Sequence, residues 1–321
     1  MILDTLTSPI ILFFALGLAA GFARSDLSIP EAVAKGLAIY LMAAIGLKGG
    51  VSVAETGLTA ELGLAALGGI ILSFVLPFPA YWLLRRVGRL DGINAAAVAA
   101  HYGSVSLVTF VTATEMLEGI GLLAPGYMAA VLALMETPAI ISGLWLARRS
   151  AHAATLGSAE GGSSLAHEVF LNASVVLLVG AFLIGLIAGK DGFAPIAPVF
   201  EGGYRGVLCL FLLDMGLIAS RRLTQTRALN SRLVALAFLL PLANGIIGVL
   251  LGTALGLDVA SAAVLGILAA SASYIAVPAA MRLALPQADP GIYLSMSLGL
   301  TFPFNIIVGI SLFALLARLL G

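Results

Sequence analysis

Two short clusters of small and polar residues interrupt long apolar runs of this chain. One is Gly103-Ser104-Val105-Ser106 in the first half, and the other is Ala270-Ser271-Ala272-Ser273 in the second half. Hydrocarbon tolerates irregular backbone only where protein buries it or where it lines a cavity, and transporters bind their substrates at such places. The two clusters therefore predict two broken membrane helices that meet at one binding site.

A break inside a membrane helix offers groups for ions of both signs. Backbone N–H groups with a partial positive charge are exposed where the second half-helix begins, and carbonyl groups with a partial negative charge where the first one ends. The former suit a small oxyanion and the latter suit sodium. Gly103 permits unusual backbone geometry. Five hydroxyls can donate to an anion or offer oxygen to a cation, namely those of Ser104, Ser106, Thr109, Ser271 and Ser273.

Each of these hydroxyls also has a structural alternative. Ser and Thr in membrane helices commonly bond back to their own backbone or pack at close helix contacts. Because the two Ser-x-Ser pairs occupy corresponding positions in the two halves, we favour the binding role for the pairs. We expect residues 103–106 and 270–273 to contact the substrate, and Ser106, Thr109, Ser271 and Ser273 to contribute to a sodium site.

Ionisable residues inside apolar runs are costly and are therefore candidates for a functional site. Glu136 lies in Met135-Glu136-Thr137-Pro138, where the proline interrupts the helical hydrogen bonds. Its carboxylate could complete a sodium shell, since hard cations prefer oxygen ligands. The alternative is a protonated glutamic acid that is hydrogen-bonded between helices.

Three further ionisable side chains have mainly structural interpretations. We expect Asp214 to pair with Lys35, Arg205 or Arg282, and Arg282 is also the predicted partner of Glu115. His101 precedes the first break and is a candidate for gating or substrate contact. A single histidine on a helix is more often a packed or hydrogen-bonding residue.

The composition places the chain among membrane proteins. Of its 321 residues 61% are hydrophobic and 10% are charged, with a mean hydropathy of +1.12, whereas soluble domains carry about 25% charged residues. Apolar stretches of about 20 residues, the length that crosses a bilayer, recur along the chain. The net charge of zero and the scattered cations argue against a nucleic acid partner. The single cysteine, Cys209, lies in an apolar run and suits a core position.

The apolar pattern predicts an all-α membrane protein with ten transmembrane helices. The expected segments are 9–23, 29–47, 60–84, 92–118 (broken), 125–147, 168–188, 196–219, 231–255, 259–285 (broken) and 291–317. A stretch rich in Ser, Gly, Ala and His separates two groups of five. The predicted domains are a first repeat (1–149), a linker (150–166) and a second repeat (167–321).

The two halves share landmarks in the same order, which indicates a duplication. Ile45-Gly46-Leu47 matches Met215-Gly216-Leu217, and Asp91 matches Asp258 at the openings of the broken segments. An odd number of spans in each repeat makes the two repeats inverted relative to each other, so that the broken helices cross near the midplane.

The distribution of basic residues gives an independent orientation, because cytoplasmic loops of membrane proteins are enriched in Lys and Arg. One side collects Arg24, Arg85, Arg86, Arg89, Arg148, Arg149, Arg221, Arg222, Arg227 and Arg232; the other side collects Lys48, Lys190 and Arg318. We assign the first side to the cytoplasm, which places both termini outside and the linker inside.

Several of these motifs together resemble the sodium-dependent bicarbonate transporter family of cyanobacteria and other bacteria. They are Ile29-Pro30-Glu31-Ala32, Ile45-Gly46-Leu47-Lys48-Gly49-Gly50, the two Ser-x-Ser breaks, Met135-Glu136-Thr137-Pro138-Ala139, and Pro286-x-Ala288-x-Pro290. The resemblance covers nearly the whole chain. It implies two inverted five-helix repeats sorted into a core with the broken helices and a supporting gate.

The resemblance also implies a function: sodium-coupled symport of bicarbonate into the cell across the bacterial cytoplasmic (inner) membrane. Bicarbonate would sit between the broken helices at Ser104, Ser106, Ser271 and Ser273, with sodium bound by hydroxyls and Glu136. The expected partners are bicarbonate, sodium, membrane lipid, two further copies in a homotrimer and a cytoplasmic PII-like regulator. Sodium would act as the coupling ion, and no cofactor is expected.

One feature departs from the family pattern. The second break of the family typically continues with an acidic residue and a small polar one, where this chain has Tyr274-Ile275-Ala276. A sodium- or proton-coupled carrier of another small carboxylate or oxyanion is therefore the main alternative. A passive channel fits the paired breaks less well. An enzyme is not expected, because the sequence holds no Gly-x-Ser-x-Gly elbow, no His-x-x-Glu-His-type run and no suitable Asp pair.

Overall fold

A computed structural model describes residues 8–151, 173–225, 229–274 and 276–321. Every regular element within these ranges is helical. Seven helices in the described ranges are long and apolar enough to cross a membrane: Glu31–Glu55, Ala60–Arg86, Gly92–Gly119, Met128–Ser150, Val176–Phe193, Ser231–Ala254 and Pro290–Leu320. Two shorter apolar helices are Pro9–Phe22 and Val259–Ala270. The chain is thus a multi-pass membrane protein.

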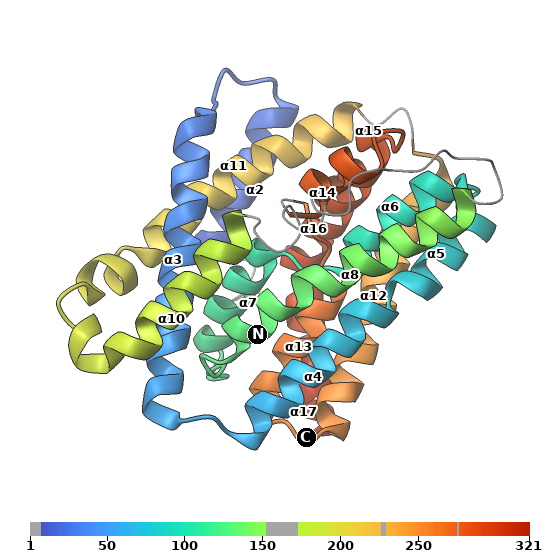
Figure 1. Ribbon diagram of the computed structural model, residues 1–321. Helices are drawn as coiled ribbons and strands as arrows, with labels where there is room; N and C mark the ends of the chain where they lie inside the picture. Colours follow the sequence, from blue (N-terminus) through green and yellow to red (C-terminus); the bar gives the residue numbers. More distant parts are fainter. Residues whose placement is uncertain (1–7, 152–172, 226–228, 275) are drawn as a thin grey trace.

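Figure 1 labels the α-helices, and the π-helical segments between them are called η in the text. They are α2 Pro9–Phe22, α3 Glu31–Thr56, α4 Ala60–Val75, α5 Pro77–Arg86, α6 Gly92–Gly103, α7 Leu107–Gly119, α8 Met128–Ala151, α10 Ala173–Phe193, η1 Pro198–Gly202, α11 Tyr204–Gln225, α12 Ser231–Ala254, α13 Val259–Ala270, α14 Ala276–Ala284, α15 Pro290–Leu294, η2 Ser295–Thr301, α16 Phe302–Phe304, η3 Asn305–Gly309 and α17 Ile310–Leu320.

Four helices, α2, α3, α10 and α11, form a group of their own on the left of Figure 1. Within it α3 packs along α10, and α2 packs along α11. Glycines allow the close approach: a Cβ atom at Gly50 would overlap the Phe182 carbonyl oxygen of α10, and one at Gly216 would overlap the Phe14 carbonyl oxygen of α2. Small residues at such crossings let helix backbones come together in a membrane, where dispersion contacts drive association.

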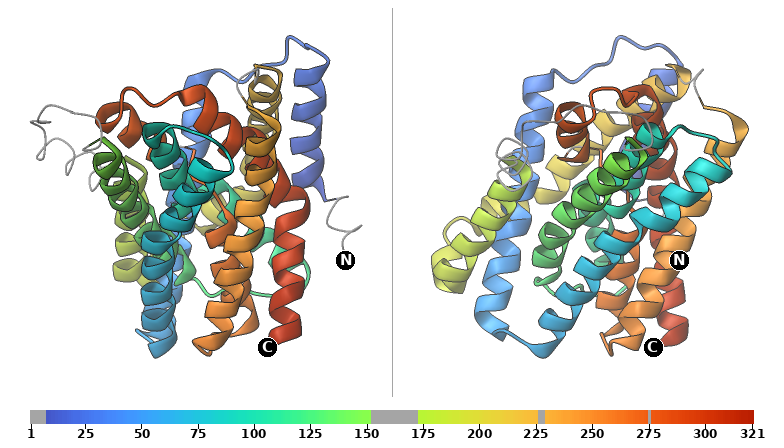
Figure 2. Two further views of the ribbon diagram at one scale, coloured as in Figure 1. Left: turned by 90° about the vertical axis from the view of Figure 1, so that its right-hand side faces the viewer. Right: turned by 45° about the vertical axis from the view of Figure 1, so that its right-hand side comes forward.

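The remaining helices form a second group around the breaks. Helix α8 packs on α4 and α6, while α12, α13 and α17 contact one another and stand side by side in Figure 2. The apolar stretch within Gly92–Gly119, which contains the first break, is entirely buried. The breaks therefore lie in the interior, where irregular backbone is shielded from lipid.

Each broken helix opens on an aspartate that caps it. Asp91 Oδ1 accepts hydrogen bonds from the backbone N–H groups of Ile93 and Asn94 at 3.0 Å each, and Asp258 Oδ1 accepts from Ala260 at 2.9 Å and Ser261 at 3.1 Å. A carboxylate there satisfies two free N–H groups and complements the helix dipole. Partial burial alone would raise the pKa of the Asp91 carboxyl, but hydrogen bonds from Asn94 and Ile93 lower it below its usual value. The two matched aspartates thus have the same structural role.

Helix boundaries differ from the expected segments in several places. Helix α3 continues to Thr56, so Lys48 lies inside the helix and not in a loop after it. The expected segment 60–84 is two helices, because Pro77 begins α5 directly after Leu76. Most of the predicted linker, 150–166, lies outside the described residues.

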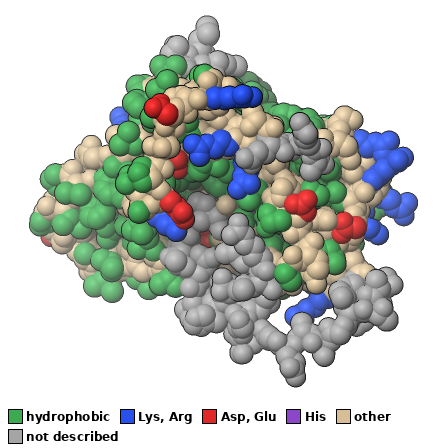
Figure 3. Space-filling model, turned by 90° about the horizontal axis from the view of Figure 1, so that it is seen from above, with side chains coloured by type: hydrophobic (Ala, Val, Ile, Leu, Met, Phe, Trp, Pro, Cys, Tyr) green, Lys and Arg blue, Asp and Glu red, His purple; other side chains and the backbone are tan. Residues whose placement is uncertain are grey.

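Basic side chains gather on one face. Helices α2, α8 and α11 all end toward the top of Figure 1, and many Lys and Arg side chains are visible on this face in Figure 3. Helices α5 and α8 carry Arg85, Arg86, Arg148 and Arg149 in their last turns. Positive charge at a helix C-terminus is also favoured by the helix dipole.

Candidate functional site

The two breaks contact each other directly. Between α6 and α7 the backbone is extended at Ser104 and Ser106, and between α13 and α14 it is extended at Ser271. The Ser106 N–H donates to Ser271 Oγ at 2.9 Å, and the Ser273 N–H donates to the His101 carbonyl oxygen at 2.9 Å. Backbone groups that a continuous helix would satisfy are thus satisfied across the two breaks.

The serines of each pair occupy equivalent positions. Ser104 and Ser271 follow the last residues of α6 and α13. Ser106 Oγ accepts from the Thr109 N–H at 3.1 Å at the start of α7, and Ser273 Oγ accepts from the Val277 N–H at 3.3 Å at the start of α14. Ser106 is thus the N-cap of α7, and Ser273 likewise accepts a hydrogen bond from an N–H group in the first turn of α14.

Ser104 and Ser271 have the structural role that hydroxyls in membrane helices commonly take. Ser271 Oγ donates back to the Leu268 carbonyl oxygen at 2.7 Å, and Ser104 Oγ donates to the Glu136 carbonyl oxygen at 3.4 Å. These bonds attach the breaks to their own helix and to α8.

Two asparagines that the sequence reasoning did not assign to the site hold the ends of the first half-helices. Asn244 Nδ2 of α12 donates to the Tyr102 carbonyl oxygen at 3.2 Å, and Asn305 Nδ2 at the start of η3 donates to the Ala270 carbonyl oxygen at 2.9 Å. A buried asparagine in an apolar helix is a signal that could have identified both. The carbonyl groups predicted to face sodium are therefore already partly occupied by amides.

A small cavity lies between the breaks. It is lined by Val105, Ser106, Leu107, Glu136, Ser273, Tyr274 and Ala276. Its volume of about 10 Å³ is room for roughly one water molecule. Four of the expected site residues thus line it, namely Val105, Ser106, Glu136 and Ser273.

The other expected site residues surround this cavity without lining it. They are Gly103, Ser104, Thr109, Ala270, Ser271 and Ala272, all buried. Gly103 was expected to provide unusual backbone geometry, but it belongs to α6, and it is not among the glycines with positive φ. A Cβ atom there would overlap the ring of Pro77. Close packing against α5 therefore explains the glycine.

Glu136 points a buried carboxylate at the cavity from α8. The residue is 5% exposed, and its Oε2 atom has no hydrogen-bond partner among the described residues. Within the same residues no basic side chain forms an ion pair with it. Since a buried carboxylate is unfavourable without a partner, the position suits a group that binds a cation or a proton.

The side chain of His101 is packed against its neighbours and hydrogen-bonded within its own helix. Its Nδ1 atom is 2.6 Å from the Ala97 carbonyl oxygen, and its ring stacks on Tyr293 at a centroid distance of 4.5 Å. It contributes to the site through its backbone carbonyl, which accepts the bond from Ser273.

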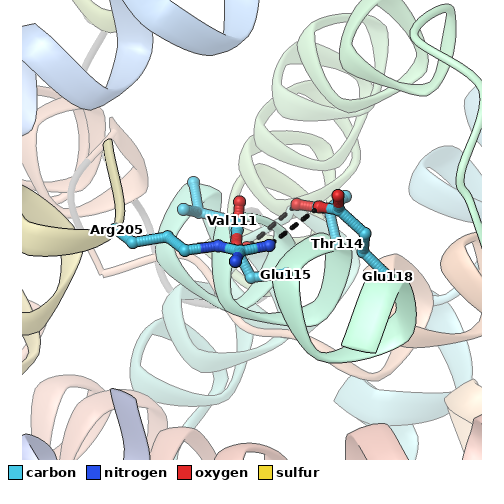
Figure 4. A network of polar contacts seen from close by, with 5 residues as sticks. All are labelled: Val111, Thr114, Glu115, Glu118 and Arg205. Atoms are coloured by element: carbon cyan, nitrogen blue, oxygen red, sulfur yellow. Dashed lines mark hydrogen bonds and ion pairs between the residues drawn. The ribbon is translucent and has the colours of Figure 1, made fainter. Parts of the chain in front are cut away.

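A charged cluster lies at the far end of α7, where Arg205 of α11 reaches two glutamates (Figure 4). Arg205 Nε is 2.5 Å from Glu115 Oε2, and Arg205 Nη2 is 3.4 Å from Glu118 Oε2. The expected pairing of Asp214 with Arg205 is therefore wrong. Lys35, the second expected partner, pairs with Glu31 at 2.7 Å.

Glu115 was expected to pair with Arg282 and pairs with Arg205 instead; the side chain of Arg282 lies outside the described residues. Arg205 is the second residue of α11, and Asp214 lies nine residues further along the same helix, too far away for the two side chains to pair. Next to the cluster is a cavity of about 230 Å³ with Lys48, Glu115, Glu118 and Tyr204 in its walls. Residues of α7 line both this cavity and the small cavity between the breaks.

The cross-break hydrogen bond gives a stability prediction. Ser271→Ala leaves the buried Ser106 N–H without its acceptor, which costs about 1–3 kcal/mol, so we expect a lower midpoint in thermal unfolding of the purified protein in detergent. The matched control is Ser297→Ala. Ser297 is equally buried, but its hydroxyl donates only back to the Tyr293 carbonyl oxygen in its own helical segment. Equal midpoints for the two variants would contradict the bond between the breaks.

Comparison with known proteins identifies the family of this chain. A search among curated proteins finds no match. The sequence model of the Na+-dependent bicarbonate transporter superfamily matches residues 9–318, which is nearly the whole chain and includes both breaks and Glu136. The chain, with its two breaks in contact and a buried carboxylate beside them, belongs to the Na+-dependent bicarbonate transporter superfamily.

Proposed function

We propose that this protein is a sodium-coupled symporter that imports bicarbonate across the bacterial cytoplasmic membrane and binds the anion between the two breaks. The observation that carries the proposal is the cavity that Ser106, Ser273 and Glu136 share where the breaks meet. Membership of the superfamily supports sodium and bicarbonate as the ions.

The anion would bind at the starts of the second half-helices. Helices α7 and α14 begin at the cavity, and their N-terminal ends carry partial positive charge. The hydroxyls of Ser106 and Ser273 can donate to an anion oxygen while they accept from the backbone of their own helix. Ser104 and Ser271 would act indirectly, by holding the extended segments in place.

The cation would bind on the Glu136 side of the same cavity. Sodium prefers oxygen ligands, and the lining offers the Glu136 carboxylate and the hydroxyls of Ser106 and Ser273. A sodium ion there would neutralise the buried carboxylate and attract the bicarbonate. Occupancy by either ion would thus favour the other, which is the basis of coupling.

The packing of the first group of helices supports two inverted repeats. In that group the first helix of the first half, α2, packs on the second helix of the second half, α11, and α3 packs on α10 in the reciprocal way. Such an exchange is what a two-fold axis in the membrane plane produces. We propose that α2, α3, α10 and α11 form the gate and that the other helices form the core.

The orientation follows from charge. The face rich in Lys and Arg would lie in the cytoplasm (Figure 3), and both termini would then lie outside. A homotrimer and a cytoplasmic PII-like regulator belong to the proposal through family resemblance alone.

Uptake into proteoliposomes tests the function. We expect radiolabelled bicarbonate to accumulate with an inward sodium gradient and not with choline in its place, in the presence and absence of carbonic anhydrase. Ser106→Ala and Ser273→Ala each remove a donor from the cavity and should lower the initial rate roughly tenfold. Ser297→Ala, the same change away from the cavity, should transport normally. Sodium-independent uptake, or normal rates in both cavity variants, would contradict the proposal.

Glu136→Gln tests the cation side. The change keeps the shape of the side chain but removes its charge, so we expect the sodium concentration for half-maximal uptake to rise roughly tenfold or more. The control is Glu31→Gln in the first turn of α3, where the carboxylate is exposed and pairs with Lys35. Unchanged sodium dependence in Glu136→Gln would exclude this carboxylate from the cation site.

A further inference from the structure

Tyr274 has a buried hydroxyl that the site as described so far does not use. The residue follows Ser273 at the second break and lines the small cavity. Its ring packs edge-on against Phe302 at a centroid distance of 5.3 Å. The hydroxyl lies beside Ser106 but forms no hydrogen bond of good geometry with any described residue.

An unpaired buried hydroxyl is a sign of function, because it loses its bonds to water on folding and gains none in return. Phe302 holds the ring in place, and Phe302 itself packs against Phe14 of α2 at 5.4 Å. The hydroxyl therefore cannot easily turn toward solvent. A tyrosine hydroxyl is protonated at neutral pH and is a good donor to an anion.

The neighbours of the hydroxyl favour an anion over a cation as its ligand. Among the described lining residues the acidic one is Glu136, which comes from α8, whereas Tyr274 lies between Ser273 and the start of α14. That start provides backbone N–H groups and partial positive charge. Tyr274, Ser106 and Ser273 thus place three hydroxyls around one space.

The ring also limits the size of this space. Tyr274 is the largest side chain in the lining, and the remaining volume is about 10 Å³. A larger carboxylate would have to displace a ring that Phe302 supports. A small planar oxyanion with oxygen acceptors on several sides requires the least displacement.

We propose that Tyr274 determines anion specificity: its hydroxyl donates to the bound oxyanion together with the hydroxyls of Ser106 and Ser273, and its ring excludes larger carboxylates. This inference rests on the proposed function for the place of the anion.

The test compares Tyr274→Phe with the wild type. Removal of the hydroxyl alone should raise the bicarbonate KM roughly tenfold, with the maximal rate and the half-saturating sodium concentration changed less than about twofold. Tyr127→Phe is the control, because it removes another buried hydroxyl, which is bonded to Ser261 at 2.8 Å outside the cavity. The control should leave KM unchanged. An unchanged KM in Tyr274→Phe, or a shift in sodium dependence alone, would overturn the inference.

A second variant separates ring from hydroxyl. Tyr274→Ser keeps a donor but removes the ring, so acetate and propionate should compete with bicarbonate uptake in this variant and not in the wild type. Equal resistance to these anions in both proteins would overturn the size role of the ring.

The unfolding midpoint measured with and without anions tests the Tyr274 contact without a transport assay. A ligand that binds only the folded protein raises its unfolding midpoint, so bicarbonate, formate and nitrate can be compared in wild type and Tyr274→Phe without vesicles. We expect at least one small anion to stabilise the wild type and to lose most of that effect in the variant. If the wild type shows no sodium-dependent uptake but this loss of stabilisation is seen, the proposed function is wrong and the anion contact is supported. Equal stabilisation of both proteins by the anions would contradict the contact.

Discussion

The need to satisfy every backbone N–H and C=O group away from water is the constraint on which this structure depends. In hydrocarbon an unpaired group costs several kcal/mol, so a helix break is stable only if other protein groups replace the missing bonds. Here each break supplies them to the other, through Ser106 to Ser271 and Ser273 to His101. The amides of Asn244 and Asn305 supply two more at the half-helix ends.

The same constraint explains why binding and stability are coupled at this site. The serines that cap α7 and α14 line the cavity, so the groups that hold the backbone are also those that meet the ions. The cavity is small in this structure, and an anion of several heavy atoms would need the breaks to separate slightly. Movement of one helix group against the other offers a way to accommodate it.

Short sequence patterns were sufficient to predict the two helix breaks. Which side chains far apart in the sequence contact each other could not be predicted in this way. Ser-x-Ser in an apolar run is a local pattern, and it located both breaks. Asp91 and Asp258 likewise stood at helix starts, where capping chemistry is readable from the sequence. The pairing of Arg205 with Glu115 joins positions 90 residues apart and depends on how α11 lies against α7, which periodicity does not reveal. Gly103 shows the same limit, since its neighbour Pro77 is known only from packing.

In the proposed mechanism one space between the two breaks holds the transported anion, and the cation binds at Glu136. The most direct measurement is a cryo-EM map of the protein in sodium bicarbonate, compared with a map in choline chloride. We expect added density for a small planar anion between Ser106, Ser273 and Tyr274, and a separate peak beside the Glu136 carboxylate, both absent in choline chloride. Bicarbonate density elsewhere in the protein, with the breaks in contact as they are here, would contradict it.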